Sequence, residues 1–295
     1  MVSMRVISIL NTIGNTPLID IDGIKAKLET YNPSGSIKDR MTVYMIKKAE
    51  LNGELEKGME IIEATSGNTG ISLAMISAAN GYKFTGIMPE SMSIERIKMM
   101  ELFGANVILT SAKDDVAGTI KKYNELIKEK PKAWLPKQFQ NKDNIEAHKN
   151  GIGKEIIQQT NSKIDAVVAG VGTGGTLLGI AYALKEANIN AKIIAVEPFE
   201  SSVLSGGKQG LHKIQGIGEG FIPELVEKNI HMIDEIIRVK SKDAIEMKDR
   251  LAKEKGVLVG ISSGANIVAA NSLKNRFKNI ITILPDRGER YISGQ

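Results

Sequence analysis

Cysteine is missing from the 295-residue sequence, and histidine occurs only three times. The absence of cysteine excludes disulfide bonds, thiolate metal sites and a cysteine nucleophile. The histidines stand at positions 148, 212 and 231, too far apart in the sequence to suggest a metal-binding cluster. We therefore expect a protein without a metal site.

Aromatic residues are also scarce, at 4% of the chain, which argues against base-stacking platforms for nucleic acid. The net charge is +5, but the basic residues are scattered among acids, as in Lys128, Glu129 and Lys130. This pattern is typical of solvated helix faces. We find no signal peptide and no apolar run long enough to cross a membrane. We expect a cytoplasmic protein that binds neither nucleic acid nor a membrane.

What the chain does contain is a regular alternation of strand-like and helix-like segments through both halves. This alternation predicts an α/β fold with mostly parallel sheets covered by helices on both faces, in one large or two medium domains. The expected strands are 18–21, 26–29, 60–63, 84–88, 107–109, 166–169, 192–196, 236–239 and 280–284. The expected helices include 6–10, 93–103, 114–129, 145–159, 177–187, 241–255 and 265–276, and the aperiodic residues 130–144 are a candidate linker.

One lysine is expected at the very start of a helix. Pro33 and Gly35 predict a turn, and Ser36 is a candidate N-cap. The apolar spacing that begins at Ile37 then predicts a helix, with Lys38 in its first turn. The positive end of the helix dipole disfavours an ammonium there and lowers the lysine pKa. Lys38 is therefore a candidate catalytic amine, although the same pattern taken alone also fits a surface lysine.

A glycine-rich loop at residues 170–176 lies between a predicted strand and a predicted helix. Its backbone N–H groups and the helix dipole form a site for an anion. Gly170, Gly172 and Gly175 also match the G-x-G-x-x-G pattern of dinucleotide-binding enzymes, and Glu197 lies where that pattern expects an acid. A dinucleotide-dependent oxidoreductase is therefore one hypothesis.

Two features of this loop favour a terminal phosphate instead. The loop lies in the middle of the chain rather than in its first strand–helix unit. Thr173 and Thr176 add hydroxyl donors, which suit a phosphate with three free oxygens better than a bridging pyrophosphate. A glycine turn that binds no ligand is a third interpretation.

Two further loops lead into predicted helices. Residues 65–70, T-S-G-N-T-G, offer hydroxyls and backbone amides that suit a carboxylate. Asn68 can both donate and accept, and so can hold a phenolic oxygen of a ring. Residues 260–266, G-I-S-S-G-A-N, form a similar loop. Each of these loops also fits a plain helix cap.

The order of these segments along the chain is informative. N-P-S-G-S-I-K-D-R at 32–40 is followed by T-S-G-N-T-G, G-V-G-T-G-G-T and G-I-S-S-G-A. Together they resemble the cysteine synthase (O-acetylserine sulfhydrylase) and cystathionine β-synthase family of fold-type-II pyridoxal-phosphate enzymes. Further matches are P-E-S-M-S-I-E-R at 89–96, Q-F at 138–139, V-E-P at 196–198, Q-G-I-G at 215–218 and G-E-R-Y at 288–291. In this family the loop at 170–176 holds the phosphate of pyridoxal phosphate.

The resemblance implies a fold like that of the tryptophan synthase β subunit, with two domains that each contain a mostly parallel twisted sheet covered by helices. Residues 35–140 would form the N-terminal α/β domain, with a mobile subdomain at about 80–130. Residues 1–34 and 141–295 would form the larger C-terminal domain that holds the phosphate.

The resemblance also assigns roles to individual residues. Lys38 would hold pyridoxal 5'-phosphate as a Schiff base, Asn68 would contact its 3-oxygen, and Ser262 would contact its pyridine nitrogen. The phosphate would lie on Gly172, Thr173, Gly174, Gly175 and Thr176. The substrate carboxylate would bind at Thr65, Ser66, Gly67, Thr69 and Gln138, and Gly216 would face the substrate amine.

The implied reaction is β-replacement on a three-carbon amino acid. Lys38, displaced by the substrate amine, would remove the α-proton, and loss of the β-substituent would give an α-aminoacrylate. Sulfide would then add, so that O-acetylserine and sulfide give cysteine. A homodimer, and binding of the C-terminus of a serine acetyltransferase, are further expectations from the family.

Glu219 departs from the family pattern, because cysteine synthases usually have a small apolar residue there. Its loop is expected near the β-end of the substrate, where a carboxylate suits a base acting on water or a thiol. This favours a second hypothesis, a lyase that consumes cysteine, releases hydrogen sulfide and forms serine, lanthionine or another thioether. A third is a non-catalytic member whose cleft binds the C-terminal carboxylate of another protein. Glu219 pointing to solvent is the plain alternative.

Overall fold

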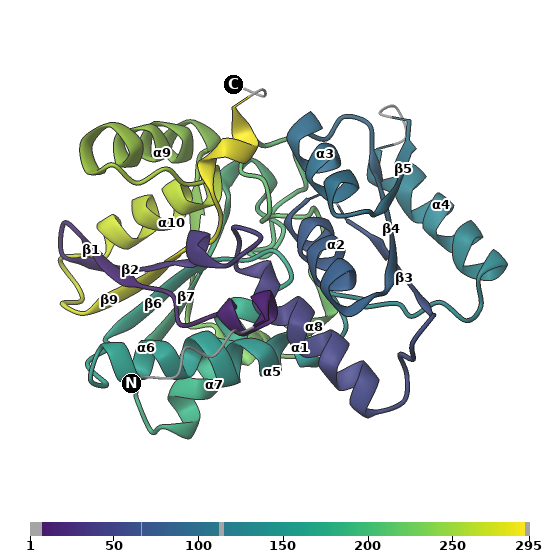
Figure 1. The fold of residues 1–295 in the computed structure, drawn as a ribbon. Coiled ribbons are helices and arrows are strands. Elements are labelled where there is room, and N and C mark those ends of the chain that lie inside the picture. Colours follow the sequence, from purple (N-terminus) through teal and green to yellow (C-terminus); the bar gives the residue numbers. More distant parts are fainter. Residues whose placement is uncertain (1–7, 66, 112–114, 293–295) are drawn as a thin grey trace.

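The computed structural model describes residues 8–65, 67–111 and 115–292, and within them the chain forms two sheets. Figure 1 shows the larger sheet on the left and the smaller on the right, with helices packed around each. The α/β class predicted from the sequence is confirmed.

The larger sheet has the strand order β1-β2-β9-β6-β7-β8. Only β1 and β2 pair in antiparallel orientation, and the other neighbouring strands are parallel. Its strands are β1 (Leu18–Ile21), β2 (Ile24–Leu28), β6 (Ala166–Gly170), β7 (Lys192–Pro198), β8 (Glu235–Val239) and β9 (Ile280–Leu284). Two strands from the start of the chain thus join four strands from its second half.

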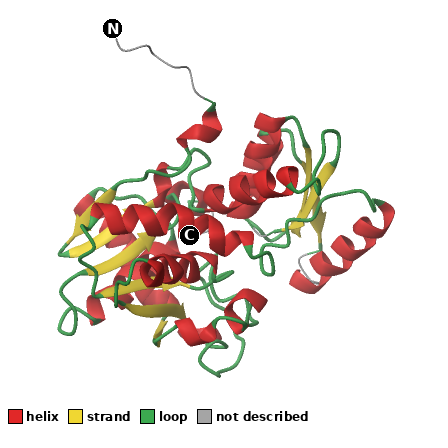
Figure 2. Cartoon of the chain, turned by 90° about the horizontal axis from the view of Figure 1, so that it is seen from below, coloured by secondary structure: helices red, strands yellow, loops and turns green. Residues whose placement is uncertain are grey.

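Helices cover both faces of this sheet, because successive residues of a strand point to opposite sides. Val168 packs in one apolar cluster with α9 and α10, whereas its neighbour Val167 packs in another with α7. Figure 2, seen from below, shows helices on both sides of these strands. The helices around this sheet are α5 (Asp143–His148), α6 (Lys154–Gln159), α7 (Gly175–Glu186), α8 (Glu224–Glu227), α9 (Ser241–Lys255) and α10 (Ile261–Ser272).

The smaller sheet consists of three parallel strands in the order β3-β4-β5. Successive residues of β3 again point to opposite faces of the sheet. Ile61 packs in an apolar cluster with α1, α2 and α3, whereas Ile62 packs in a small cluster with α4. The strands are β3 (Glu60–Ala64), β4 (Lys83–Pro89) and β5 (Asn106–Thr110), and the helices are α1 (Lys38–Leu51), α2 (Asn68–Asn80), α3 (Ile94–Leu102) and α4 (Asp115–Glu129). The predicted domain boundaries near residues 35 and 140 stay a prediction, as does the mobility of residues 80–130.

Three predicted helices were wrong in detail. The helix expected at 6–10 is a 3-10 turn at Ile9–Thr12, and Val6 lies outside the described residues. The helix expected at 145–159 is split into α5 and α6 by a π-helical turn at Lys149–Gly153. Gly153 there packs so closely on α7 that a Cβ would lie 2.5 Å from Cβ of Ala183. This close approach to α7 gives the turn its physical reason.

The third difference places two serines inside a helix. α10 begins at Ile261 rather than at 265, so Ser262 and Ser263 belong to its first turn. Gly264, which indicated a loop in the sequence, instead lets α10 approach α9. A Cβ there would lie 2.0 Å from the backbone oxygen of Ala244.

The candidate linker at 130–144 forms backbone hydrogen bonds with a strand of the smaller sheet. Trp134 is buried, and its N–H donates to the Glu60 oxygen at 2.8 Å. The N–H of Ile62 in turn donates to the Trp134 oxygen at 3.0 Å. The segment is therefore anchored along β3 before it reaches Gln138.

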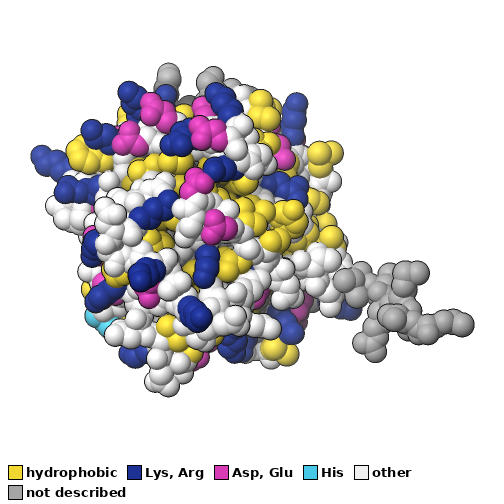
Figure 3. Space-filling model, turned by 90° about the vertical axis from the view of Figure 1, so that its left-hand side faces the viewer, with side chains coloured by type: hydrophobic (Ala, Val, Ile, Leu, Met, Phe, Trp, Pro, Cys, Tyr) yellow, Lys and Arg dark blue, Asp and Glu magenta, His cyan; other side chains and the backbone are white. Residues whose placement is uncertain are grey.

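Basic and acidic side chains are interspersed on the face that Figure 3 shows. In the part of the chain that the structure describes, no helix is both long and apolar enough to cross a membrane. Within the same residues, no group of three or more His, Asp or Glu side chains could hold a metal ion.

Candidate active site

A cavity of about 440 Å³ opens where β3, β4 and β6 end, and residues from both sheets line it. The carboxyl ends of parallel strands are where α/β proteins commonly bind ligands. The predicted site residues that line this cavity are Lys38, Thr65, Gly67, Asn68, Thr69, Gln138, Gly172, Thr173, Gly174, Thr176, Gly216, Glu219 and Ser262. Ser66 lies outside the described residues, and Gly175 lies behind the lining in the first turn of α7.

Lys38 is the first residue of α1, in agreement with the sequence, and its side chain lines the cavity. The Ser36 hydroxyl accepts a hydrogen bond from the Lys38 backbone N–H at 3.3 Å. The N-cap position is nevertheless Ile37, without a side-chain capping bond, so the N-cap predicted at Ser36 was wrong by one residue. Burial lowers the pKa of the Lys38 amine, while the carboxylates of Glu219 and Asp286 oppose this shift. The amine is therefore closer to its neutral, nucleophilic form than an exposed lysine would be.

A buried carboxylate next to Lys38 ties two helices together at the cavity. Asp39 accepts hydrogen bonds from the Ser34 N–H at 2.8 Å and from the hydroxyls of Ser34 and Ser72. Ser72 belongs to α2, so these contacts join the first turn of α1 to the N-terminal part of α2. Asp39 is fully buried and stabilises the start of the helix on which Lys38 lies.

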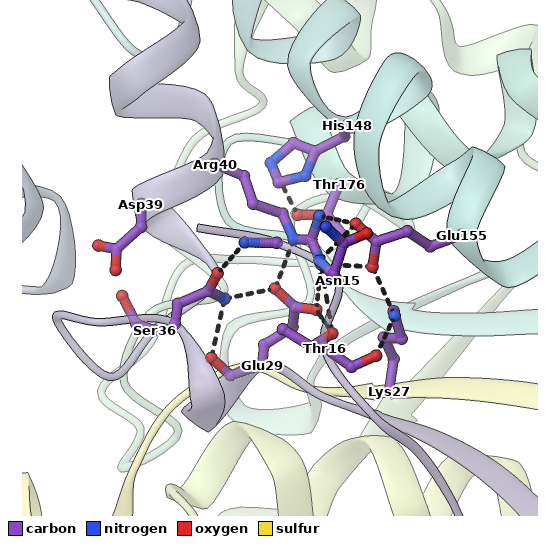
Figure 4. A network of polar contacts seen from close by, with 12 residues as sticks. Asn15, Thr16, Lys27, Glu29, Ser36, Asp39, Arg40, His148, Glu155 and Thr176 are labelled. Atoms are coloured by element: carbon purple, nitrogen blue, oxygen red, sulfur yellow. Dashed lines mark hydrogen bonds and ion pairs between the residues drawn. The ribbon is translucent and has the colours of Figure 1, made fainter. Parts of the chain in front are cut away.

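A network of buried charges holds the same helix turn against the larger sheet, as Figure 4 shows. Arg40 Nε donates to Glu29 at 2.6 Å, and its two terminal nitrogens donate to Glu155 at 2.6 and 2.9 Å. Lys27 from β2 lies 2.6 Å from the same Glu155 carboxylate. Burial alone would raise the pKa of Glu155, but its hydrogen bonds to Arg40 and Lys27 lower it to about 2. The network therefore stays charged at neutral pH and positions α1.

The loop before α7 forms a cradle of backbone N–H groups and hydroxyls. Gly174 has φ +85°, in the left-handed region that favours glycine. A Cβ on Gly172 would lie 2.4 Å from the backbone oxygen of Gly216, so a side chain has no room there. Thr173 and Thr176 line the cavity beside this backbone. The donor set, at the N-terminus of a 12-residue helix, fits the dianionic phosphate of pyridoxal phosphate.

The acid that the dinucleotide hypothesis requires is engaged elsewhere. Glu197 is buried, and its two carboxylate oxygens accept the N–H groups of Leu204 at 2.8 Å and Ser205 at 3.1 Å. It is absent from the lining of the cavity. The carboxylate thus stabilises a turn after β7, and the G-x-G-x-x-G match does not indicate a ribose site.

The N-terminus of α2 and Gln138 form a second polar end of the cavity. The Thr65 hydroxyl accepts the N–H of Gly70 at 3.2 Å, and the Thr69 hydroxyl donates to Oε1 of Gln138 at 2.7 Å. With Oε1 engaged, Nε2 is the part of the Gln138 amide that can donate to a ligand. Helix N–H groups next to an amide donor suit a carboxylate.

Two residues with no role assigned from the sequence fix the orientation of Asn68. Asn68 Nδ2 donates to Asp286 at 2.7 Å, and Arg290 donates to Asn68 Oδ1. Asp286 also accepts the Tyr291 hydroxyl at 2.5 Å, so it is itself held in place. One Nδ2 hydrogen of Asn68 is then left for the cavity. The G-E-R-Y segment was part of the family resemblance, but spacing alone could not show that Arg290 reaches Asn68.

Glu219 and Ser262 complete the wall opposite α2. Glu219 lines the cavity instead of pointing only to solvent, and burial raises its pKa against the attraction of Lys38, His212 and Arg96. Ser262 lies in the first turn of α10 and also lines the cavity. A carboxyl and a hydroxyl therefore share the cavity with the Lys38 amine.

Glu63 is a site residue that the sequence reasoning missed. It is the penultimate residue of β3, lines the cavity and is only 4% exposed. Its carboxylate accepts the Lys137 N–H at 3.0 Å, at a residue with φ +52°, directly before Gln138. Burial raises the pKa of Glu63 to about 7. The signal in the sequence was that Glu63 is a charged residue in a strand that was expected to be buried.

Comparisons with known proteins show the family to which the chain belongs. The sequence model of the family described as "Pyridoxal-phosphate dependent enzyme" matches residues 9–286. The chain is 46% identical to cysteine synthase of Staphylococcus aureus (strain Mu50 / ATCC 700699), over 97% of this chain and 95% of that protein.

Two similar solved structures differ in the activity that they are named for. The cysteine synthase of Entamoeba histolytica has a TM-score of 0.93 and 43% identity, covering 99% of this chain and 90% of that one. A hydrogen sulfide-producing enzyme of Fusobacterium nucleatum has a TM-score of 0.91 and 41% identity, covering 97% and 100%. The family that the motifs indicated is confirmed. The chain belongs to the family of pyridoxal-phosphate dependent enzymes.

Proposed function

We propose that the protein replaces the β-substituent of a three-carbon amino acid and forms cysteine from O-acetylserine and sulfide. The observation that carries the proposal is that a lysine amine, a phosphate cradle and a carboxylate site line one cavity. The similarity to cysteine synthases, at 46% and 43% identity, supports the choice of substrates.

The residues present fit pyridoxal 5'-phosphate. Thr173, Thr176 and the backbone of the loop at 172–175 would hold its phosphate, Asn68 its 3-oxygen and Ser262 its ring nitrogen, with Lys38 as the attaching amine. Gly216 would lie beside the ring and the substrate amine. Bound there, pyridoxal phosphate supplies an electron sink for the charge that develops at the substrate Cα.

The other steps belong to side chains of this protein. Thr65, Ser66, Gly67, Thr69 and Gln138 bind and orient the substrate carboxylate. Lys38, whose pKa is lowered by burial, takes the proton from Cα and returns it to Cα after the new bond at Cβ has formed. Closure of residues 80–130 over the carboxylate would exclude water during these steps.

An assay with O-acetylserine and sulfide tests this function. We expect the purified enzyme to form cysteine, and Lys38→Ala to lower kcat at least about 10³-fold, since general acid–base catalysis and attachment are both lost. Lys142→Ala, at an exposed lysine, is the matched control and should be unchanged. Failure of the wild-type enzyme to form cysteine, or full activity of Lys38→Ala, would contradict the proposal.

The position of Glu219 favours a second candidate, a lyase that releases hydrogen sulfide from cysteine and forms serine, lanthionine or another thioether. A carboxyl that lines the cavity with a raised pKa can act as a base on water or a thiol. A similar structure is named as a hydrogen sulfide-producing enzyme. If this candidate holds, the enzyme releases sulfide from cysteine alone, and Glu219→Gln slows that release while it leaves cysteine synthesis largely intact. No sulfide, or equal release by Glu219→Gln, argues for synthesis only.

Partners follow from the same proposal. A homodimer is expected, and sedimentation of the purified enzyme tests it against a monomer. The N-terminal end of α2 would also accept the C-terminal carboxylate of a serine acetyltransferase, which titration with its C-terminal peptide tests. Robust turnover of amino acids would remove the case for a solely partner-binding protein. A cytoplasmic location stays a prediction.

A further inference from the structure

Asn144 lies directly behind the cavity, between its phosphate end and its carboxylate end. It is fully buried in the first turn of α5 and is not among the residues that line the cavity. Asn144 Nδ2 donates to the backbone oxygen of Gln138 at 2.9 Å and to the Thr173 hydroxyl at 3.0 Å. A residue that cannot touch a ligand therefore contacts one residue from each end.

The orientation of the Asn144 amide follows from its two partners. The backbone oxygen of Gln138 can only accept, so the Nδ2 side of the amide must face it. The opposite orientation would place Oδ1 against a carbonyl oxygen. Oδ1 instead faces the start of α7, where a Cβ on Gly175 would lie 2.0 Å from it. Position 175 therefore needs a glycine for Asn144 to come this close.

The contact determines what the Thr173 hydroxyl can do. Its oxygen accepts one hydrogen bond from Asn144 and another from the Gly175 N–H at 3.3 Å. A hydroxyl oxygen has two lone pairs, so both are engaged and the O–H hydrogen is directed to a further acceptor. Since Thr173 lines the cavity, the hydroxyl is free to donate to an oxygen of an anion that binds there.

Gln138 is held from three sides. Glu63 accepts the N–H of the preceding Lys137, Asn144 donates to the Gln138 carbonyl, and Thr69 donates to its side-chain Oε1. Of these contacts, the one from Asn144 is shared with the phosphate loop. A shift of Thr173 is therefore transmitted to the backbone of Gln138 through one amide group.

We propose that Asn144 is a positioning residue that makes Thr173 a hydrogen-bond donor to the cofactor phosphate and couples it to the substrate-carboxylate residue Gln138. The inference rests on the proposed function, which gives Thr173 and Gln138 those ligands. Because coupling of binding is reciprocal, a carboxylate bound beside Gln138 should tighten cofactor binding through the same residue.

A double-mutant cycle on the full chain tests the first half of the proposal. The dissociation constant of pyridoxal phosphate is measured by equilibrium dialysis for wild type, Asn144→Ala, Thr173→Val and the double variant. In the wild-type background we expect Asn144→Ala to weaken cofactor binding about tenfold, as for loss of one hydrogen bond to a charged group. In a protein that already carries Thr173→Val, the same substitution should weaken binding less than about threefold. Asn141→Ala, on the same loop, is the matched control and should change binding little.

Two further readouts separate positioning from a merely structural role. The ³¹P resonance of the bound cofactor should shift in Asn144→Ala and not in Asn141→Ala. The wild type should bind the cofactor more tightly when a carboxylate without an amine, such as propionate, is added, and Asn144→Ala should lose that enhancement. Asn144→Asp, which keeps the shape but replaces the donor by an acceptor, should weaken binding more than alanine and serves if the alanine variant fails to fold.

The outcomes distinguish this inference from the proposed function. If Thr173→Val leaves cofactor affinity unchanged, the phosphate assignment itself is wrong. If Thr173→Val weakens binding but Asn144→Ala has the same effect in both backgrounds, only the role of Asn144 is overturned. An unshifted ³¹P resonance in Asn144→Ala would overturn it as well.

Discussion

Replacing Arg40 with methionine would remove the cation that pairs with both Glu29 and Glu155 in the network of Figure 4. Methionine keeps a long apolar stem, so the loss of charge dominates over the loss of packing. Glu155 retains Lys27 as a partner. Glu29, at 0% exposed, retains two hydrogen-bond donors among the described residues, the neutral Thr16 and Asn32.

The size of the effect follows from that difference. Removing one partner of a buried ion pair costs about 3–5 kcal/mol, because the other charge stays buried. At about 2.1 cal/mol/K per residue, the 295 residues have an unfolding entropy of about 0.6 kcal/mol/K. A loss of about 4 kcal/mol therefore lowers Tm by roughly 6–7 °C.

A second substitution tests the origin of this loss. Adding Glu29→Gln to Arg40→Met removes the carboxylate that is left buried without Arg40, and should recover about half of the lost free energy.

Urea unfolding of the holoenzyme at pH 8, followed by the fluorescence of the single tryptophan, measures these changes. The matched control is Arg250→Met, which breaks an exposed pair with Glu254 and should cost less than about 1 kcal/mol. A loss in Arg40→Met as small as in this control, or one that does not respond to Glu29→Gln, would refute the reasoning.

Three further changes test other parts of the site. Glu63→Gln probes a carboxyl whose pKa burial raises to about 7 from 4.5. Between those pH values the folded wild type keeps this proton while the unfolded chain loses it. The stability of the wild type therefore falls by up to about 3 kcal/mol as pH rises, and denaturant titrations should show no such fall in the variant. Gly172→Ala would place a Cβ 2.4 Å from the backbone oxygen of Gly216, so it should weaken cofactor binding, measured by dialysis, at least about tenfold. Gly151→Ala, whose Cβ meets only the end of the Arg40 side chain, should not weaken that binding. Asp286→Ala removes the acceptor for Asn68 and should shift the visible absorbance of the bound cofactor and lower kcat about tenfold; an unchanged spectrum would contradict the orientation assigned to that amide.

The parts of the fold that were predictable from the sequence depend on neighbouring residues. The turn at Pro33 and Gly35 and the apolar period after it predicted Lys38 at a helix start, which the structure has, although the N-cap is Ile37 rather than Ser36. The glycine loop at 170–176 was expected between a strand and a helix for the same reason, and the structure has β6 and α7 there. These features arise from backbone freedom and local hydrogen bonds.

Contacts between distant segments were not predictable in this way. Asn68 and Asp286 are separated by 218 residues, and no spacing rule connects them. Gly264 indicated a loop, but in the structure it lies within α10 and provides room for packing against α9. Asn144 carried no motif signal, because its importance comes from two loops that only the folded chain brings together.

The central claim is that the Lys38 amine holds the cofactor in this cavity. Reduction of the holoenzyme with borohydride, followed by trypsin digestion and mass spectrometry, tests it directly. The account predicts that the mass of the reduced cofactor appears on the peptide that contains Lys38. Its appearance on a different lysine, with Lys38 unmodified, would contradict the account.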